Sequence, residues 1–301
     1  MTSAPVVAVV GPTAAGKSDL AVDLAIEIGG EVVNADSMQL YRGMDVGTAK
    51  LTEAERRGVV HHLLDALDVS EPATVAAFQT LARHAIDDCV RRDVPPIVVG
   101  GSALYIRAVL DRFTFPGTDA QLRTGLEAEL ATVGSHALHD RLAERDPEAA
   151  AAILPSNGRR IVRALEVIEL TGRPYVATLP GMAYFYDNAI QLGLDVPRDV
   201  LDERIERRVD RMWKAGLVDE VSRLERDGLR DGRTASRALG YAQVLRHLAG
   251  ELTEQQARDE VVRATRRFAR RQDSWFRKDH RIGWIPYDAP DALDQALALI
   301  R

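Results

Sequence analysis

The sequence predicts an α/β fold, in which helices flank a parallel sheet and the chain carries an additional all-helical insertion. An apolar run at residues 6–10 leads through a glycine-rich loop into a helix, which is the first unit of such a sheet. Short strand-like and longer helix-like segments then alternate through the first third of the chain. Residues 119–171 show helical periodicity without a strand, so the insertion is expected there.

The order of the elements follows from the same patterns. Short apolar runs predict strands at residues 5–10, 31–34, 96–99, 189–196 and 281–286. Helical spacing of apolar residues predicts helices at residues 17–28, 74–92, 199–227, 236–249, 254–280 and 291–300, and one that begins at Ser102.

The insertion is expected at residues 115–190, and the flanking parts, 1–114 and 191–301, are expected to form one core. Residue types that favour helix ends bound the helices of the insertion. The expected helix starts are Asp119, Ser135 and Asp146-Pro147, and the expected stop is Thr171-Gly172-Arg173-Pro174.

The segment after the first strand fits the G-x-x-x-x-G-K-[ST] spacing of a phosphate-binding loop. Its glycines let backbone N–H groups face inward, and the helix that begins near Lys17 directs the positive end of its dipole to the same point. Lys17 adds a point charge, and the Ser18 hydroxyl can reach a Mg²⁺ ion. ATP-binding proteins share this spacing, so the loop predicts a polyphosphate but does not identify its carrier. The phosphate-binding loop comprises Gly11, Pro12, Thr13, Ala14, Ala15, Gly16, Lys17 and Ser18.

Composition and charge narrow the class of protein. The chain of 301 residues has one cysteine, Cys89, which excludes an internal disulfide framework and a multi-cysteine metal site. No apolar stretch approaches the length of a membrane span and no basic leader is present, so we expect a cytoplasmic protein without a membrane partner. The net charge is −6, yet residues 204–211 and 258–281 are rich in arginine, so an acidic chain can still present a basic face.

A second polar cluster follows the strand at residues 31–34. Asp36 stands just beyond the carboxyl end of that strand, where ligands bind in open α/β sheets, so it is expected to face the phosphate-binding loop. A carboxylate there can hold Mg²⁺, bind a ribose or act as a general base. The strand at 96–99 ends in Gly-Gly-Ser instead of the Mg²⁺-binding Asp of many nucleotide hydrolases. We therefore expect the phosphate to belong to a leaving or transferred group in a small metabolic reaction.

Together, these residues resemble the tRNA dimethylallyltransferase (isopentenyl-diphosphate:tRNA transferase) family. The resemblance covers the chain nearly end to end, and residues 36–50 and the TRRFARRQ segment are its most specific parts. Ser18 and Ser102 stand where Thr is common in the family, which keeps the hydroxyl. The matching segments are GPTAAGKS at 11–18, DSMQLYRGMDVGTAK at 36–50, HHLLD at 61–65, VVGGSALYIRAVL at 98–110, RRIVRALEVIELTGRP at 159–174, RIERRVDRMWKAGLVDEV at 204–221, SRALGY at 236–241 and TRRFARRQDSWFRKD at 265–279.

The resemblance implies an activity and its substrates. Enzymes of this family move the dimethylallyl group of dimethylallyl diphosphate to the exocyclic amine of the adenosine immediately 3′ of the anticodon, in tRNAs that read codons beginning with U. Diphosphate leaves, so the loop binds a prenyl donor instead of a nucleoside triphosphate, and no Asp is needed to hold Mg²⁺ for phosphoryl transfer. We therefore expect Mg²⁺ as the cofactor, tRNA and dimethylallyl diphosphate as partners, and a monomer.

The chemistry implied by the resemblance assigns roles to the loop and to Asp36. The charge of the leaving diphosphate is expected to meet Lys17, the loop N–H groups, Mg²⁺ on Ser18 and an arginine. Arg208 is the candidate arginine, although it can equally face RNA. The adenine amine is a poor nucleophile, so a base that removes its proton as the C–N bond forms assists the reaction, and Asp36 is the candidate base. The adenosine must leave the anticodon stack, so base flipping is expected.

Arginines at helical spacing are expected to contact RNA phosphates, although a solvated, salt-bridged face would show the same spacing. The resemblance also implies that the insertion grips the anticodon arm, and that Thr13 and residues 36–39 meet the flipped nucleotide. The arginine pairs are Arg160 with Arg163, Arg204 with Arg208, and Arg266 with Arg270. The full set of expected tRNA contacts is Thr13, Asp36, Ser37, Met38, Gln39, Ser102, Arg123, Arg159, Arg160, Arg163, Arg266 and Arg270.

Three other functions share part of this pattern. A P-loop kinase of a small metabolite would use the loop but would leave the insertion and the basic helices unexplained. A prenyltransferase acting on free adenine nucleotides would share the loop and Asp36, with less need for an RNA-gripping insertion. A non-catalytic RNA binder would not need Asp36 beside an intact loop.

Two further pairs of residues are candidates for a site. His61 and His62 lack partners at metal-ligand spacing, so we expect no zinc site at them. Tyr41 and Tyr105 can line a prenyl or base pocket, or pack in the core.

Overall fold

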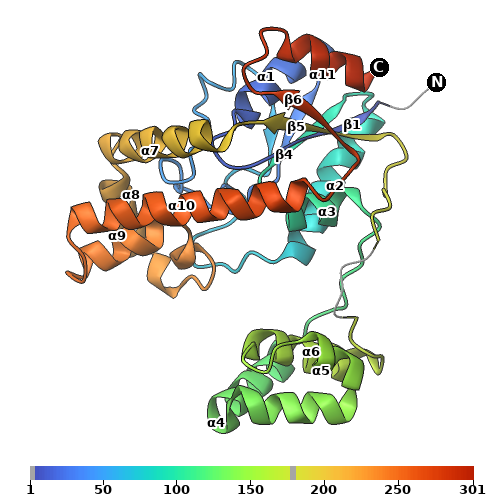
Figure 1. The fold of residues 1–301 in the computed structure, drawn as a ribbon, viewed down its shortest axis with the longest axis vertical. Helices are drawn as coiled ribbons and strands as arrows, with labels where there is room; N and C mark the ends of the chain where they lie inside the picture. The colour runs from blue at the N-terminus through green and yellow to red at the C-terminus, as the bar shows by residue number, and fades with distance from the viewer. Residues whose placement is uncertain (1–3, 177–180) are drawn as a thin grey trace. The chain divides into compact units, whose positions relative to one another are not determined.

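The computed structural model describes residues 4–176 and 181–301. The chain forms two compact units, which Figure 1 shows. Within the described residues, no helix combines the length and the hydropathy needed to cross a lipid bilayer. Unit 1 consists of Met1–Arg112 and Ala183–Arg301, and unit 2 consists of Phe113–Met182.

The boundary of unit 2 differs from the predicted insertion, residues 115–190, mainly at the carboxyl end. Residues 183–188 belong to unit 1 because they are hydrogen-bonded to it. The backbone N–H of Phe185 donates to the Leu110 carbonyl over 2.7 Å, and the Asn188 side chain donates to the Ala4 carbonyl over 2.7 Å.

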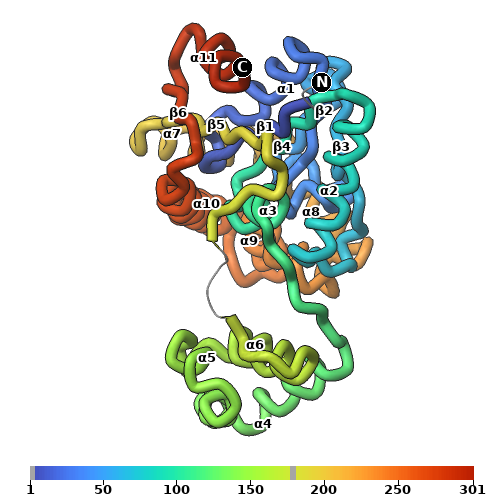
Figure 2. Tube along the Cα trace, turned by 90° about the vertical axis from the view of Figure 1, so that its right-hand side faces the viewer, coloured from blue at the N-terminus to red at the C-terminus, as the bar shows by residue number. Residues whose placement is uncertain are grey.

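Unit 1 is built on a parallel sheet with the strand order β3-β2-β4-β1-β5-β6, which Figure 2 shows from one side. The central strand, β1, lies between β4 and β5, and all of its residues are buried. A strand covered on both faces has no polar side, which explains the sequence VVAVV. The predicted parallel sheet is confirmed. Its strands are β1 Val6–Val10, β2 Glu31–Asn34, β3 His61–His62, β4 Pro96–Gly100, β5 Ala189–Asp195 and β6 Ile282–Pro286.

Helices cover both faces of the sheet (Figure 1). The even-numbered residues of β1 pack in one core with α2 (Val75–Arg91) and α3 (Ala103–Leu110). The odd-numbered residues pack in a second core with α1 (Lys17–Ile28) and α11 (Ala292–Ile300). Both layers are the ones that the alternation of apolar segments predicts.

A further group of helices from the second half of the chain extends unit 1 beside the sheet. Leu201 and Ile205 of α7 pack against Ala269 of α10. α8 and α9 cover Tyr41 and Met44, and so fix the segment that follows β2. These helices are α7 Arg198–Lys214, α8 Leu217–Arg226, α9 Tyr241–Leu248 and α10 Glu254–Phe276, with 3₁₀ turns η1 Leu229–Asp231 and η2 Ala235–Arg237.

Three elements differ from the predicted ones. The helix predicted at 199–227 is two helices, α7 and α8, because Gly216 adopts a left-handed φ of +91° between them. The helix predicted at 236–249 begins only after Gly240, which has a φ of +90°. β3 has two residues, which is too short for any periodic signal.

Unit 2 is all-helical within its described residues. The predicted caps are confirmed, because the side chain of Asp119 accepts the Leu122 N–H and that of Asp146 accepts the Ala149 N–H. Gly134 interrupts the first helix with non-helical angles, one residue before the predicted start at Ser135. The helices are α4 Ala120–Arg145, α5 Pro147–Ala152 and α6 Gly158–Thr171, and the last ends at Gly172.

Candidate active site at the phosphate-binding loop

The phosphate-binding loop, residues 11–18, leaves β1 at its carboxyl end and turns into α1. Gly11 and Gly16 have φ angles of +136° and +104°, a region that glycine enters without steric cost. α1 begins directly after Gly16, as predicted. Arg204 of α7 donates to the Ala15 carbonyl over 3.1 Å, so the loop is tied to α7 as well as to the sheet.

Lys17 is the cation of this loop. Its Nζ donates to the Pro12 carbonyl over 2.8 Å, so the ammonium folds back across the loop. Burial, and then the positive charge of Arg208, lower the pKa of Lys17 to about 8, while Asp36 acts in the opposite direction. A site that keeps two cations together in this way is suited to an anionic ligand, because the ligand's charge favours the protonated lysine.

Arg208 reaches the loop from the same helix as Arg204, as their four-residue spacing predicts. Its guanidinium donates to Thr13 Oγ1 over 3.4 Å and to the Thr48 carbonyl over 3.2 Å. Burial lowers the pKa of Arg208, and the charge of Asp36 opposes this shift. Of the two positions considered for Arg208, it takes the one beside the phosphate-binding loop.

Asp36 lies just past the end of β2 and faces the same space. Its Oδ1 accepts the Met38 N–H over 2.9 Å, and its own N–H donates to Asn34 Oδ1 over 2.9 Å. Within the described part of the chain, Oδ2 has no hydrogen-bond partner. One carboxylate oxygen therefore fixes the side chain, and the other remains available to a ligand.

A cavity joins these groups. It contains about 730 Å³ of empty space, part of which is open to solvent. The loop, the ends of β2 and β4, and the helices α7 and α10 all contribute to its wall. The lining residues are Thr13, Lys17, Ser18, Ala21, Val32, Asn34, Asp36, Gln39, Leu51, His61, Leu64, Val99, Gly100, Gly101, Arg208, Phe268 and Gln272.

Some residues expected at the site do not line this cavity. The Met38 side chain packs in the core under α8 and α9, and Ser102 stands at the start of α3. Ser37 is also absent from the lining of the cavity. Tyr105, like Tyr41, is buried in a core cluster, which is one of the two roles that the sequence allows for these tyrosines.

Gln272 is a site residue that sequence reasoning missed. It comes from α10, and its amide bridges two parts of the cavity wall. Its Oε1 accepts the Thr13 N–H over 2.9 Å, and its Nε2 donates to the Gly101 carbonyl over 2.7 Å. A Cβ on Gly101 would lie 2.5 Å from Nε2, so a side chain at this position would displace the Gln272 amide. The segment TRRFARRQ contains Gln272, but nothing in its pattern distinguishes the glutamine from the arginines as the residue that faces the cavity. Phe268 of the same helix also lines the cavity and was missed.

A buried carboxylate holds the segment that follows Asp36. Glu220 of α8 accepts the N–H groups of Asp45, Val46 and Gly47 over 3.2, 2.8 and 3.2 Å. It also accepts the Tyr241 hydroxyl over 2.6 Å. A Cβ on Gly47 would lie 2.5 Å from the Tyr241 ring, which explains the glycine. Glu220 and Tyr241 therefore fix the backbone close to Thr48, whose carbonyl meets Arg208.

The arginines of unit 2 that were predicted to contact RNA differ in their positions. Arg123 and Arg163 both form ion pairs with Glu166, whose side chain is fully buried. Arg159 and Arg160 are exposed at the first turn of α6. The first two help to hold unit 2 together, so a contact with RNA would be an additional role.

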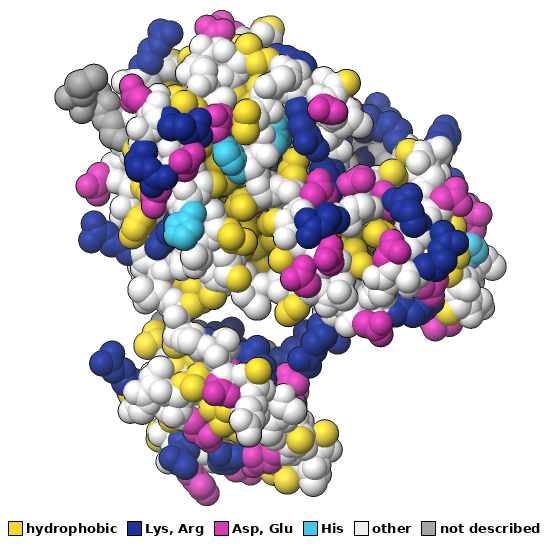
Figure 3. All heavy atoms as spheres, turned by 180° about the vertical axis from the view of Figure 1, so that it is seen from behind, with side chains coloured by type: hydrophobic (Ala, Val, Ile, Leu, Met, Phe, Trp, Pro, Cys, Tyr) yellow, Lys and Arg dark blue, Asp and Glu magenta, His cyan; other side chains and the backbone are white. Residues whose placement is uncertain are grey.

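The two arginines of α10 that were predicted to contact RNA are paired with acidic residues of α7. Arg266 donates to Glu206 over 2.8 Å, and Arg270 donates to Asp202 over 3.2 Å. Basic and acidic side chains are also interspersed over the face of the larger unit seen in Figure 3. The charge of each arginine is thus partly compensated within the helix pair.

Comparisons with known proteins identify the family of the chain. The sequence model of the IPP transferase family matches residues 39–279. A protein of Thermobifida fusca named tRNA dimethylallyltransferase is 64% identical over 300 residues, which is 98% of this chain and 94% of that protein. One of the same name from Streptomyces avermitilis is 65% identical over 295 residues, with 97% and 94% covered.

Two solved structures are similar as well. The tRNA isopentenylpyrophosphate transferase of Bacillus halodurans has a TM-score of 0.72 and 43% identity, with 98% of this chain and 95% of that chain covered. A eukaryotic dimethylallyltransferase, described as acting on tRNA, has a TM-score of 0.82 and 26% identity, with 98% and 78% covered.

Proposed function

This chain belongs to the IPP transferase family, and we propose that it moves the dimethylallyl group of dimethylallyl diphosphate to an adenosine of tRNA. The activity itself, prenylation of tRNA, is that of relatives that match nearly the whole chain. The finer part of the proposal is the acceptor atom, the exocyclic amine of the adenosine 3′ of the anticodon in tRNAs that read codons beginning with U. The observation that supports the proposed transfer is that Asp36, Lys17 and Arg208 line one cavity.

The phosphate-binding loop is suited to the diphosphate of the donor. Lys17 and Arg208 offer two positive charges, and the start of α1 adds the N–H groups of its first turn. As the bond from the prenyl carbon to the diphosphate oxygen breaks, negative charge grows on that oxygen. Groups already aimed at this position stabilise the transition state without having to reorganise.

Asp36 is suited to the acceptor side of the reaction. Its Oδ1 is held by the Met38 N–H, and its Oδ2 can take a proton from the adenine amine. In this step the C–N bond forms, the C–O bond to diphosphate breaks, and the amine proton moves to Asp36. Diphosphate then leaves with the electron pair of the broken bond.

The residues present also fit Mg²⁺. This cation prefers oxygen ligands, and the Ser18 hydroxyl lines the cavity. β4 ends in glycines, so most of the remaining ligands would be diphosphate oxygens and water. When bound, the ion supplies further positive charge to the leaving diphosphate.

The RNA side of the proposal rests on the chemistry of base flipping. An amine inside a base stack cannot reach a buried prenyl group, so the adenosine must turn out into the cavity. We assign the grip on the anticodon arm to unit 2, with exposed Arg159 and Arg160 as phosphate contacts.

One chain supplies every residue assigned here, which supports a monomer. The tRNA substrate supports a cytoplasmic enzyme.

The test is a transfer assay with dimethylallyl diphosphate labelled in its prenyl group. The protein is incubated with the donor and Mg²⁺ in separate reactions, each of which contains one acceptor: unmodified tRNA, AMP, ADP or ATP. We expect label in tRNA alone, on N6 of the adenosine 3′ of the anticodon. Label in free AMP or ADP would instead support the nucleotide prenyltransferase. Turnover of ATP without label transfer would support the kinase.

A further inference from the structure

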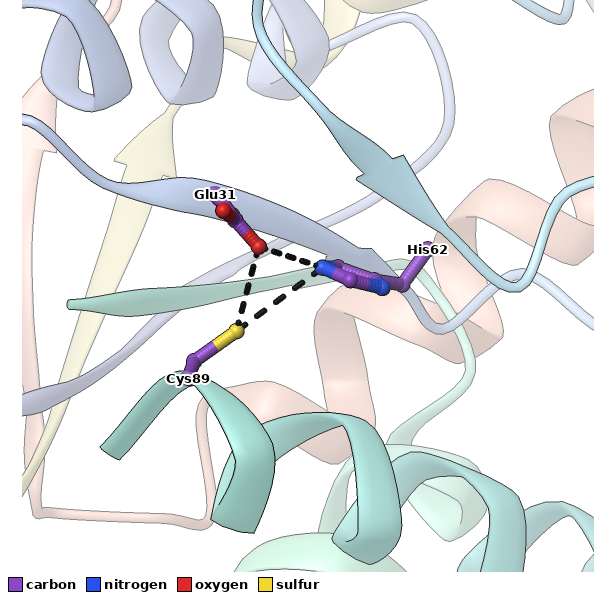
Figure 4. A group of neighbouring side chains, drawn as sticks. All are labelled: Glu31, His62 and Cys89. Carbon is purple, nitrogen blue, oxygen red and sulfur yellow. Dashed lines mark hydrogen bonds and ion pairs between the residues drawn. The ribbon is translucent and has the colours of Figure 1, made fainter. Parts of the chain in front are cut away.

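Three side chains with metal-binding atoms meet at one edge of the sheet, outside the catalytic cavity. Glu31 comes from β2, His62 from β3 and Cys89 from α2, and Figure 4 shows that they point toward one another. Their ligand atoms all lie within 4.8 Å of one another. None of the three lines the catalytic cavity.

The spacing of these atoms is close to that of a tetrahedral metal site. Bonds of about 2.3 Å to sulfur and about 2.0 Å to nitrogen or oxygen place tetrahedral ligand atoms roughly 3.3–3.5 Å apart. Cys89 Sγ lies 3.4 Å from Glu31 Oε2 and 3.8 Å from His62 Nε2. His62 Nε2 and Glu31 Oε2 are 2.6 Å apart because they share a hydrogen bond, so this pair must separate slightly around an ion.

The donor set decides which kind of cation fits. A thiolate and an imidazole favour a borderline-soft ion such as Zn²⁺ over Mg²⁺ or Ca²⁺, which prefer oxygen. Cys89 is fully buried, whereas the His62 and Glu31 side chains are 25% and 15% exposed and leave a path for the ion. The fourth position is then left for water.

Arg92 is the group that opposes a cation here. Its guanidinium donates to both oxygens of Glu31 over 2.7 Å and lies 3.5 Å from Cys89 Sγ. An ion bound to Glu31 Oε2 would leave Oε1 hydrogen-bonded to Arg92. The arginine would then orient the carboxylate, but its charge would weaken the binding of the ion.

We propose that Glu31, His62 and Cys89 form a binding site for a divalent cation of the Zn²⁺ type. On binding, the thiol of Cys89 gives up its proton to solvent. His62 Nε2 also loses the proton of its hydrogen bond to Glu31, and the neutral imidazole then carries its proton on Nδ1. His62 Nε2 and Glu31 Oε2 each form a bond to the metal in place of that hydrogen bond. The ion joins β2, β3 and α2, and so stabilises the folded chain by mass action. The three ligands are far apart in the sequence, which is why the histidine spacing alone predicts no zinc site.

Co²⁺ is the probe for the test, because it takes the same geometry and its thiolate bond absorbs in the near ultraviolet. We expect wild-type protein to show this charge-transfer band, and Zn²⁺ to displace Co²⁺ and raise the thermal midpoint. Cys89→Ser should lose the band, and both Cys89→Ser and His62→Gln should weaken binding by at least about 100-fold, since loss of even an outer-shell partner costs 10–100-fold. His84→Gln, an exposed histidine of α2, is the matched control and should bind as wild type does.

Arg92→Gln gives a second, independent outcome that does not depend on losing a ligand. It removes the opposing charge but keeps a donor for Glu31, so we expect binding to tighten by about tenfold or more. Two results would overturn the proposal: no charge-transfer band in wild-type protein, or equal Co²⁺ affinity in wild type, Cys89→Ser and His62→Gln. Weaker binding in a folded Arg92→Gln protein would also count against it.

Discussion

The two oxygens of the Asp36 carboxylate have different roles. Oδ1 holds the Met38 N–H, and Oδ2 is the oxygen assigned to the amine proton. Asp36→Asn keeps an oxygen acceptor for Met38 but loses the base. We expect single-turnover transfer at saturating substrates to fall by at least about 100-fold, because general bases contribute about 10²–10⁴.

The control for this variant is its affinity for tRNA, which filter binding should find within about twofold of wild type, because Asn differs from Asp by only one group. An unchanged single-turnover rate would show that another group accepts the proton.

The lowered pKa of Lys17 predicts that binding of the donor is coupled to protonation of this lysine. Its pKa in the free protein is about 8, and a diphosphate beside it raises that pKa. At a pH of about 8.5, Lys17 is mostly neutral before binding and charged afterwards, so the complex takes up more than half of a proton. At a pH of about 6.5 the lysine is charged in both states and contributes no uptake.

Calorimetry in two buffers of different ionisation enthalpy measures this uptake directly. Lys17→Met, which keeps an unbranched side chain of similar length without the charge, should abolish this uptake and weaken binding of the donor. Equal uptake in wild type and Lys17→Met would assign the proton to another group.

At the scale of elements, the segment after Asp36 depends on a carboxylate from α8. Glu220 accepts three backbone N–H groups and the Tyr241 hydroxyl while almost fully buried. Glu220→Gln turns an NH₂ group toward donors that need an acceptor. We expect the free energy of unfolding to fall by at least about 2 kcal/mol, since a hydrogen bond to a charged group is worth about 1.5–3 kcal/mol.

Tyr241→Phe is the matched variant, because it removes one of these bonds and leaves the three backbone contacts. Urea unfolding should find it destabilised by only about 1 kcal/mol. Similar losses in both variants would show that the backbone contacts carry little of the stability.

The pairing of α10 with α7 changes what its arginines are expected to do. An arginine on RNA phosphate contributes a slope of about −0.7 to −0.9 in log K against log salt. Arg266 and Arg270 face Glu206 and Asp202, so part of their charge is already compensated. Replacing both arginines by Ala should therefore flatten the slope for tRNA, but by less than about 1.4, the smallest change that two full contacts would give.

Filter binding at several salt concentrations checks this, with cognate and non-cognate tRNA weakened alike because phosphates carry no sequence information. Flattening by the full amount of two contacts would mean that the ion pairs open on RNA. An unchanged salt slope in the variant would mean that these arginines do not contact the RNA.

Most elements could be predicted, and the exceptions have local causes. The apolar runs of β1 and β4 are strong signals because both strands are buried on both faces. β3 pairs through two histidines and has no apolar pattern at all. Gly216 separates two helices that share one amphipathic pattern, and only its backbone angle shows the break.

The site at the scale of the whole molecule could be predicted only in part. Lys17, Ser18 and Asp36 follow from strand ends, which a parallel sheet brings to one edge. Gln272 reaches Thr13 from the far end of the sequence, and nothing in a helical pattern marks which polar side chain will turn inward. The same holds for Glu220, which sequence periodicity alone would place at the surface or in the core equally.

The division into two units predicts that one can be removed. The N–H of Arg112 donates to the Ala183 carbonyl over 2.8 Å, so the two ends of unit 2 meet in unit 1. Replacing residues 113–182 by a short Gly-Ser linker should leave a folded unit 1 that binds dimethylallyl diphosphate. We expect the affinity of this shortened protein for tRNA to fall by at least about 100-fold, because the phosphate contacts assigned to unit 2 are removed.

Circular dichroism and donor calorimetry establish that the shortened protein is folded and competent on its prenyl side. Undiminished tRNA affinity in that protein would place the grip on the anticodon arm in unit 1.

The position of β1 between β4 and β5 also sets an order of events on the ribosome. β1 is made early, yet its neighbour β5 begins at Ala189, after the whole of unit 2. During synthesis, one edge of a wholly apolar strand therefore has no partner, and such edges recruit other chains. Unit 2 has its own core and can fold before β5 is synthesised and the sheet is completed. The insertion thus carries a cost in the nascent chain, where it prolongs the exposure of β1.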